Sequence, residues 1–316
     1  MTIKENAMMG KKETRIFYKG VGITASGSPL FCFLSPVSCL LLIFFAVSAL
    51  GSDAILPLDS VKKRVWYNTY GSFSTLSSDD SRKEVSGDEF GFMVGYDRRV
   101  GSYALFGFGL GGDWTTAEKK NRSYELEIPS VKGLFHAKFA GNRWYLDVNA
   151  DFGAGQYDEI FRTPSDEFRF SDWKKQWGIG AELGAQWERG LAKTEPFLGL
   201  RQTILDDGLN DNALTILSVG CRHNWKFSGP LAVIKPGFFG GYVHQFDDNL
   251  ITSGCWTPCA TVYRIPDVTM PQDRIFVGLN LTMSMRQSLD IYGKFCSDFA
   301  SDYSSYSFFA GMNWNF

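Results

Sequence analysis

Few residues in this chain of 316 amino acids have the types and spacing that catalysis requires. The best candidate is His244, which lies shortly before Asp247 and Asp248 and could form an acid–base cluster with them. Such a site also needs carboxylates opposite the histidine, which Asp206 and Asp207 could supply. Acidic residues in loops are more often only solvated. We therefore predict no catalytic residues and expect that the protein is not an enzyme.

The other residues that could do chemistry give weaker signals. His136 and His223 have no partners in register that would complete a catalytic triad. The run Gly107–Gly112 lies inside an alternating segment and not at a strand-to-helix turn, which excludes a nucleotide-binding interpretation. Cys255 and Cys259 have no matching His or Cys pair nearby. We therefore predict neither a metal site nor a bound cofactor.

Composition and charge narrow the class of protein. The net charge of −2 indicates no basic surface for nucleic acid, so no nucleic-acid partner is expected. Aromatic residues make up 16% of the chain and there are 33 glycines, whereas the hydrophobic fraction of 44% is low for a helical membrane protein. A membrane β-barrel need not be more apolar, because every second residue of each strand faces a polar interior.

Residues 1–51 have the pattern of a secretion signal. A leader with excess positive charge precedes the apolar run Leu30–Ala49, and the small residue Gly51 ends a typical signal-peptidase site. A transmembrane helix is the alternative, but Pro36 and several serines interrupt the run. We predict that the signal peptide is cleaved before Ser52 and that the protein is exported.

From Val65 to Phe316, apolar and polar residues alternate with a period of two, which is the pattern of β-strands. About twelve such segments follow one another, and each is long enough for a tilted strand to cross a membrane, which takes about 9–11 residues. Short connections such as Ala140–Gly141 alternate with longer ones. The long set is Leu76–Asp88, Thr115–Ser123, Tyr157–Lys175, Asp206–Asn212, Asp247–Asp273 and Ala300–Ser305. This sorting is typical of membrane barrels, with short turns on the periplasmic side and long loops outside.

The sequence therefore predicts an all-β fold, a transmembrane antiparallel β-barrel of about 12 strands over residues 65–316. The signal peptide 1–51 and a short linker, 52–64, precede it. Aromatic residues near strand ends predict the interfacial girdles, namely Trp66, Trp114, Trp144, Tyr157, Trp187, Trp225, Tyr242, Tyr306 and Trp314. Polar residues on the other face predict a lumen lined by Asp147, Asp151, Glu182, Arg201, Lys235, Arg274, Asp290 and Lys294. These charges could set pore selectivity or contact the linker, but solvation of the lumen by paired charges is the more favoured interpretation.

An exported protein meets an oxidising compartment, where cysteines can pair. Cys255 and Cys259 flank Pro258 in the longest loop and could form a small disulfide-closed turn. We expect Cys221, which would point toward lipid, and Cys296, which would point into the lumen, to remain free.

A series of short motifs along residues 65–316 resembles the C-terminal translocator, or β-domain, of autotransporters, the type V secretion proteins. In order, the motifs lie at Tyr96–Arg99, Phe106–Gly112, Trp144–Asp147, Glu182–Gly184, Glu195–Phe197, His244–Asp247 and Phe308–Phe316. The resemblance implies a translocator pore or membrane anchor in the bacterial outer membrane, with both termini periplasmic. It also implies that the linker enters the lumen, where Lys62, Lys63 and Arg64 would meet carboxylates of the wall. The final strand resembles the family's assembly signal, which here would be Phe308, Met312, Trp314 and Phe316.

The same resemblance implies the partners, which are outer-membrane lipid, the barrel-assembly machinery and periplasmic chaperones, with the barrel itself monomeric. One departure affects the functional prediction. Autotransporters carry a large passenger before the barrel, whereas only about a dozen residues separate the predicted cleavage site from the first strand here. We expect a barrel with essentially no passenger. The alternative is a barrel-only porin, or a surface adhesin that uses its extracellular loops.

Overall fold

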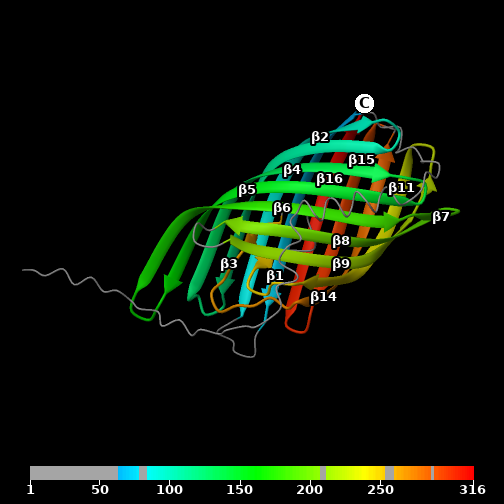
Figure 1. Ribbon diagram of the computed structural model, residues 1–316. Helices are drawn as coiled ribbons and strands as arrows, with labels where there is room; N and C mark the ends of the chain where they lie inside the picture. Colours follow the sequence, from blue (N-terminus) through cyan, green and yellow to red (C-terminus); the bar gives the residue numbers. More distant parts are fainter. Residues whose placement is uncertain (1–62, 78–83, 207–210, 253–259, 286–287) are drawn as a thin grey trace, which may run out of the picture. The chain divides into compact units, whose positions relative to one another are not determined.

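Long antiparallel strands follow one another around a ring (Figure 1). The computed structural model describes residues 63–77, 84–206, 211–252, 260–285 and 288–316. The long strands are β1 (Lys63–Leu76), β2 (Val85–Val100), β3 (Ala104–Lys119), β4 (Tyr124–Ala140), β5 (Trp144–Arg162), β6 (Glu167–Ala185), β8 (Ala192–Asp206), β9 (Asp211–Trp225), β11 (Ala232–Gln245), β14 (Asp273–Met285), β15 (Leu289–Phe299) and β16 (Tyr303–Asn315). The short strands are β7 (Trp187–Arg189), β10 (Phe227–Ser228), β12 (Ile251–Thr252) and β13 (Val262–Tyr263). Within the described ranges, no helix is long and apolar enough to span a membrane.

The ring is closed because the first strand pairs with the last. β1 and β16 run antiparallel from Arg64 opposite Asn315 to Leu76 opposite Tyr303. Each other long strand pairs with the long strands before and after it in the chain. The result is a 12-stranded antiparallel barrel, which confirms the predicted fold class. Closure matters in lipid, where every unpaired backbone donor or acceptor costs several kcal/mol.

The alternation of residue types decides which face of each strand points into the barrel. On β14, Arg274, Phe276 and Gly278 are buried, whereas Ile275 and Val277 between them are about half exposed on the outside. The same alternation runs along the other long strands, so the outer surface is mostly apolar and aromatic. Two aromatic residues depart from the predicted girdles. Trp66 is only 5% exposed and Tyr157 likewise 5%, and the side chains of both point into the barrel.

The two ends of the barrel differ. One end holds the start of β1, the end of β16 and short turns, at residues 101–103, 141–143, 190–191 and 229–231. At the other end, two of the predicted long loops are mostly strand, because β3, β4, β5 and β6 continue into tight turns at residues 120–123 and 163–166. The loops expected at Thr115–Ser123 and Tyr157–Lys175 were therefore wrong in length. The one long connection with described residues at this end is 246–272, which contains β12 and β13.

Inside the barrel, the buried apolar residues gather toward the end that carries this long connection. The larger cluster joins wall residues such as Leu126, Ile128 and Leu214 with Val262 and Tyr263 of the connection itself. The described parts of the connection thus pack against the inner wall. A smaller cluster around Trp66 lies nearer the opposite end.

Candidate functional site: the barrel lumen

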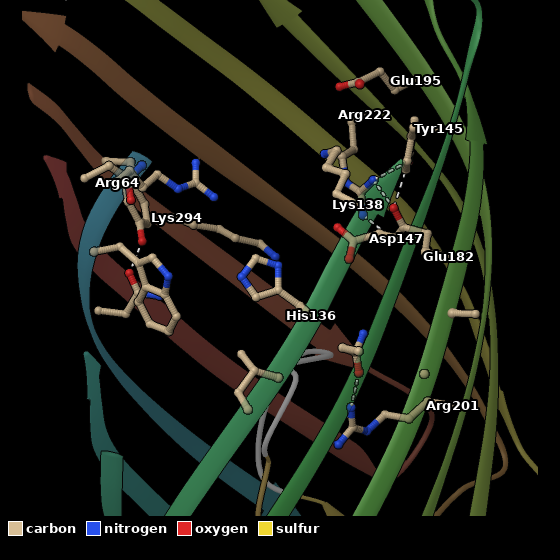
Figure 2. Close-up of a pocket in the computed structure, with 18 of the residues that line it drawn as sticks. Arg64, His136, Lys138, Tyr145, Asp147, Glu182, Glu195, Arg201, Arg222 and Lys294 are labelled. Atoms are coloured by element: carbon tan, nitrogen blue, oxygen red, sulfur yellow. Dashed lines mark hydrogen bonds and ion pairs between the residues drawn. The ribbon is translucent and has the colours of Figure 1, made fainter. Parts of the chain in front are cut away.

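The half of the lumen next to Lys63 and Phe316 contains a cavity of about 520 Å³, which we call the vestibule (Figure 2). Its walls come from β1, β4, β5, β6, β8, β9, β15 and β16, and they are largely polar. Charged and ionisable side chains project into it from opposite sides, among them Arg64, His136, Lys138, Glu182, Arg222 and Lys294. These residues lie far apart in the sequence, and the closed ring is what brings them together.

Most charge in the vestibule is paired between side chains of different strands. Arg222 donates to both carboxylate oxygens of Glu182 at 2.6 Å and to the hydroxyl of Tyr145 at 2.7 Å. Tyr145 in turn donates to Glu182 at 2.8 Å, and the guanidinium of Arg222 lies 4.1 Å from the ring centre of Phe197. A two-pronged, charge-assisted contact of this kind is strong and fixes both side chains. The wall here is therefore pre-arranged and not a set of mobile charges.

Asp97 organises a second polar group near the start of the barrel. Its carboxylate, which is fully buried, accepts hydrogen bonds from Arg64 at 2.5 Å and from the indole nitrogen of Trp66 at 2.8 Å. Nε2 of His136 lies 2.8 Å from the same carboxylate. Arg64 thus belongs to β1 and to the lumen wall, so its predicted place in the linker was wrong. Arg64 does contact a lumen carboxylate, but this is Asp97 and not one of the carboxylates expected for it, Asp147, Glu182 or Asp290.

All eight polar residues that were predicted to line the lumen lie on the inner faces of their strands. Four of them border the vestibule, namely Asp147, Glu182, Arg201 and Lys294. Deeper in the lumen, Asp151 pairs with Arg201 at 2.5 Å. Arg274 pairs with a carboxylate of β15 at 3.4 Å. Lys235 and Asp290 face inward near the end with the short turns.

Halfway along the lumen lies a group that sequence reasoning missed, which we call the wall cluster: Lys132, Asp113 and Glu89. The side chains are at most 3% exposed, and the Lys132 ammonium contacts Asp113 and lies 3.3 Å from Glu89. Tyr70 donates to Asp113 at 3.1 Å. Each residue occupies an inward position of its strand, so extending the alternation along β2, β3 and β4 would have found all three.

His244 has a different partner from those considered above for an acid–base cluster. His244 bonds through Nδ1 to Asp273 at 2.8 Å, and Tyr242 also donates to this carboxylate. His244 lies on the outer face of β11, because inward positions of that strand are the odd-numbered ones such as Val243. Asp207 lies outside the described residues. The histidine therefore has a different carboxylate partner and does not face the lumen.

The cysteines partly differ from the prediction. Cys221 is free and exposed on the outer face, as expected. Cys296 is buried against the lumen and forms a disulfide, so the expectation that it would be free was wrong. Its partner lies outside the described residues, because the other described cysteine is free. Cys255 and Cys259 also lie outside them, and the bridge between these two stays a prediction.

The predicted assembly signal occupies one face of the last strand. Phe308, Met312, Trp314 and Phe316 all point outward and are 38–65% exposed. The backbone N–H of Phe316 donates to Lys63 at 2.9 Å and extends the pairing between the two ends of the ring. The exposed apolar outer face of this strand is available both to lipid and to a protein that recognises the final strand.

Comparison with known proteins decides the family. The autotransporter β-domain profile matches residues 65–295, which is most of the chain and most of the barrel. The chain belongs to the autotransporter β-domain family. As a β-domain it is an outer-membrane barrel that serves as translocator and membrane anchor. A sequence search of curated proteins finds no match.

Solved structures share the fold of this β-domain. The translocator domain of autotransporter NalP from Neisseria meningitidis is 17% identical with a TM-score of 0.65, covering 89% of this chain and 95% of its own. The β-domain of the Bordetella autotransporter BrkA is 14% identical with a TM-score of 0.63, covering 80% and 99%. The transport unit of AIDA-I from Escherichia coli is 12% identical with a TM-score of 0.59, covering 89% and 98%. At these identities the likeness concerns the fold of the barrel.

Proposed function

We propose that this β-domain spans the bacterial outer membrane as a pore through which its own chain is exported, and that it then anchors that chain. The supporting observation is the pairing of charges inside a closed ring whose outside is apolar. Phe92, Leu110 and Leu279 are each more than half exposed on the outside. A basic group facing lipid near the midplane would cost about 2–4 kcal/mol. The vestibule charges avoid that cost because they face one another.

For the orientation, we propose that both ends of the barrel sequence are periplasmic. Lys63 and Asn315 lie at the same end of the ring as the short turns. Short turns mark the periplasmic side in bacterial membrane barrels. The long connection 246–272 then lies at the cell surface, after a signal peptide has directed the chain to the periplasm.

The linker is the natural occupant of the vestibule. Residues 52–62 lie outside the described residues, and Lys63 alone separates them from Arg64, which lines the vestibule. A chain advances at most about 3.3–3.6 Å per residue, so a segment of this length that starts at the wall of the vestibule can reach into it. We propose that it enters the vestibule from the periplasmic end.

We propose no catalytic activity and no bound cofactor. The expected partners are lipid, the barrel-assembly machinery and periplasmic chaperones, with one barrel acting as a monomer. The outward face of Phe308 and Trp314 supports recognition of the last strand by an assembly protein, since these side chains pack against nothing in the lumen. Neither a porin nor an adhesin role has a specific observation in its favour.

Surface display of a tag tests the export function. A short epitope placed between Gly51 and Ser52 should become accessible to antibody on intact cells if the barrel exports its own N-terminal segment. The same tag placed after Phe316 is the control and should be reached only after the outer membrane is permeabilised. An N-terminal tag that stays hidden on intact cells, in a barrel that is folded and heat-modifiable, would contradict the translocator role.

A further inference from the structure

The outer half of the lumen is not built like a water-filled pore. On β4, the inward residues Leu126 and Ile128 are at most 1% exposed, whereas Glu125 and Glu127 occupy the outward positions. On β9, the inward residue Leu214 is 1% exposed. An apolar inner wall in contact with water would be unfavourable, because transfer of apolar surface out of water drives burial. This part of the wall therefore needs an apolar occupant.

The long connection between β11 and β14 supplies that occupant. Leu250, Ile251, Val262, Tyr263 and Ile265 are each at most 4% exposed. They form one continuous apolar cluster with the wall residues. β12 and β13 pair as a small hairpin, which satisfies part of the backbone of the connection inside the barrel. The connection is therefore folded against the wall, with a core of its own.

Polar contacts join the same connection to the wall cluster. The ammonium of Lys132 donates to the hydroxyl of Thr261 at 2.7 Å, and this hydroxyl donates to Asp113 at 3.0 Å. The backbone N–H of Thr261 lies 3.3 Å from Glu89 and donates to it. A buried ion cluster needs each remaining donor and acceptor satisfied, or it is costly. Thr261 contributes to that satisfaction.

Two further wall side chains bind the backbone of the connection. Gln176 donates to the carbonyl of Ala260 at 2.7 Å and accepts from the N–H of Val262 at 3.0 Å. Tyr157 donates to the carbonyl of Val262 at 2.9 Å. Buried backbone groups outside regular pairing need such partners. The wall thus supplies hydrogen-bond donors and an acceptor for the backbone groups of Ala260 and Val262.

Two small cavities border the wall between the vestibule and the docked connection. The cavities found there among the described residues measure about 20 Å³ and about 10 Å³. A single water needs about 10–15 Å³ of such volume. Each cavity therefore holds about one water, and neither offers a path for hydrated ions.

We propose that residues 250–252 and 260–270, which we call the stopper, close the outer end of the lumen from within. The barrel then has one polar vestibule open toward its periplasmic end and a sealed outer end. This goes beyond the translocator role, because nothing can pass outward while the stopper is docked. Export of a segment requires the stopper to be undocked, and a segment that remains in the lumen on its way to the surface keeps it undocked. When no segment passes through the outer end, the stopper docks and closes the pore.

Thiol labelling tests the docked state directly on the full chain in cells. Two neighbouring positions serve as probe and matched control: Val268 is 5% exposed, whereas Thr269 is exposed. In a Cys221→Ser background, with modification read at the introduced cysteine by peptide mapping, a membrane-impermeant maleimide should modify Thr269→Cys at least about tenfold faster than Val268→Cys, because labelling of a buried site requires local opening. Equal rates at the two positions would overturn the stopper.

The labelling experiment also separates this inference from the proposed orientation. If Thr269→Cys reacts only after the cells are lysed, while Val268→Cys remains slow, the orientation is wrong and the stopper stands. If both react quickly on intact cells, the orientation stands and the stopper fails. Both cysteine variants must show the heat-modifiable folded form, so that slow labelling reports burial.

Single-channel conductance in planar bilayers tests closure. Replacement of residues 247–271 by a short Gly–Ser turn removes the stopper. These limits keep the backbone hydrogen bond from Gln245 to Gln272, which joins the two flanking strands. Deletion of residues 53–62 removes the linker instead. The linker would close the vestibule and the stopper would close the outer end, so either one is enough to block the lumen. Full-length protein and each single deletion should therefore conduct poorly, and the double deletion should conduct at least about tenfold more.

Each departure from that pattern has one meaning. A linker deletion that conducts well by itself would overturn the stopper. A stopper deletion that conducts well by itself supports the stopper and contradicts the placement of the linker in the vestibule. A double deletion that remains closed, although it is folded and heat-modifiable, would show that another part of the chain seals the lumen and would also overturn the proposal.

Discussion

Replacing Tyr263 by alanine measures how firmly the stopper is held. The side chain is fully buried, and its hydroxyl approaches Gly87 so closely that a Cβ there would lie 2.8 Å from it. Burial raises the pKa of Tyr263 far above the physiological range, so the phenol is neutral and its loss removes packing but no charge. Truncation of a buried large aromatic residue costs about 3–5 kcal/mol. Since about 1.4 kcal/mol is tenfold, the undocked fraction should rise by roughly two to three and a half orders of magnitude.

The assay is the labelling rate of Val268→Cys in the Cys221→Ser background. When closing is fast compared with modification, this rate is proportional to the undocked fraction. Tyr263→Ala should therefore raise it about a hundredfold or more, until it approaches the rate of Thr269→Cys. Two controls accompany it. Tyr263→Phe keeps the ring and should change the rate only slightly, and Tyr306→Ala, an outward-facing tyrosine, should leave it within about twofold.

An unchanged labelling rate in Tyr263→Ala would refute the reasoning, provided that the parent rate is slow. It would mean that the described packing contributes nothing to docking, and that a covalent or backbone restraint alone holds the segment. A large increase in both Tyr263→Ala and Tyr306→Ala would also refute it, since general loosening of the barrel and not local undocking would explain the result.

Three further predictions concern the wall, assembly and the disulfide. Lys132→Met leaves two buried carboxylates without their ammonium, so the free energy of unfolding should fall by about 3–5 kcal/mol. Urea titration of the folded, heat-modifiable band should show this as a lower midpoint, and an unchanged midpoint would contradict the buried pairing. Deletion of Phe316 should reduce the amount of folded protein in the membrane, and normal insertion would contradict its role as an assembly signal. Non-reducing peptide mapping should find Cys296 joined to Cys255 or Cys259, because both belong to the connection that packs in the same lumen. A peptide with Cys255 joined to Cys259 would instead support the bridge predicted from the sequence.

The alternation of residues was sufficient to predict the barrel, because a period of two specifies both the strand and the face that meets lipid. It also placed Asp147, Glu182 and Arg201 correctly on the inner face. It could not assign partners, since pairing depends on the register between strands that are distant in sequence. Arg222, the partner of Glu182, lies forty residues further on and two strands away around the ring. Trp66 was misplaced because a tryptophan near a strand end can lie either in the outer aromatic girdle or inside the barrel. Here it lies inside, where its indole N–H donates to Asp97.

The stopper, in contrast, has a sequence signal that a search for membrane strands overlooks. At the outer end of β4 the alternation keeps its period but exchanges its faces, so that Leu126 and Ile128 point inward and Glu125 and Glu127 outward. Such an inversion is the pattern of a strand whose outside meets water and whose inside meets an apolar core. The strand therefore passes out of the lipid while it remains in the ring. Beyond that level the apolar inner wall needs an apolar occupant. The longest connection provides one, because its residues Val262 and Tyr263 pack against that wall. An exchange of faces at constant period thus predicts both where the membrane ends and that something apolar occupies the lumen beyond it.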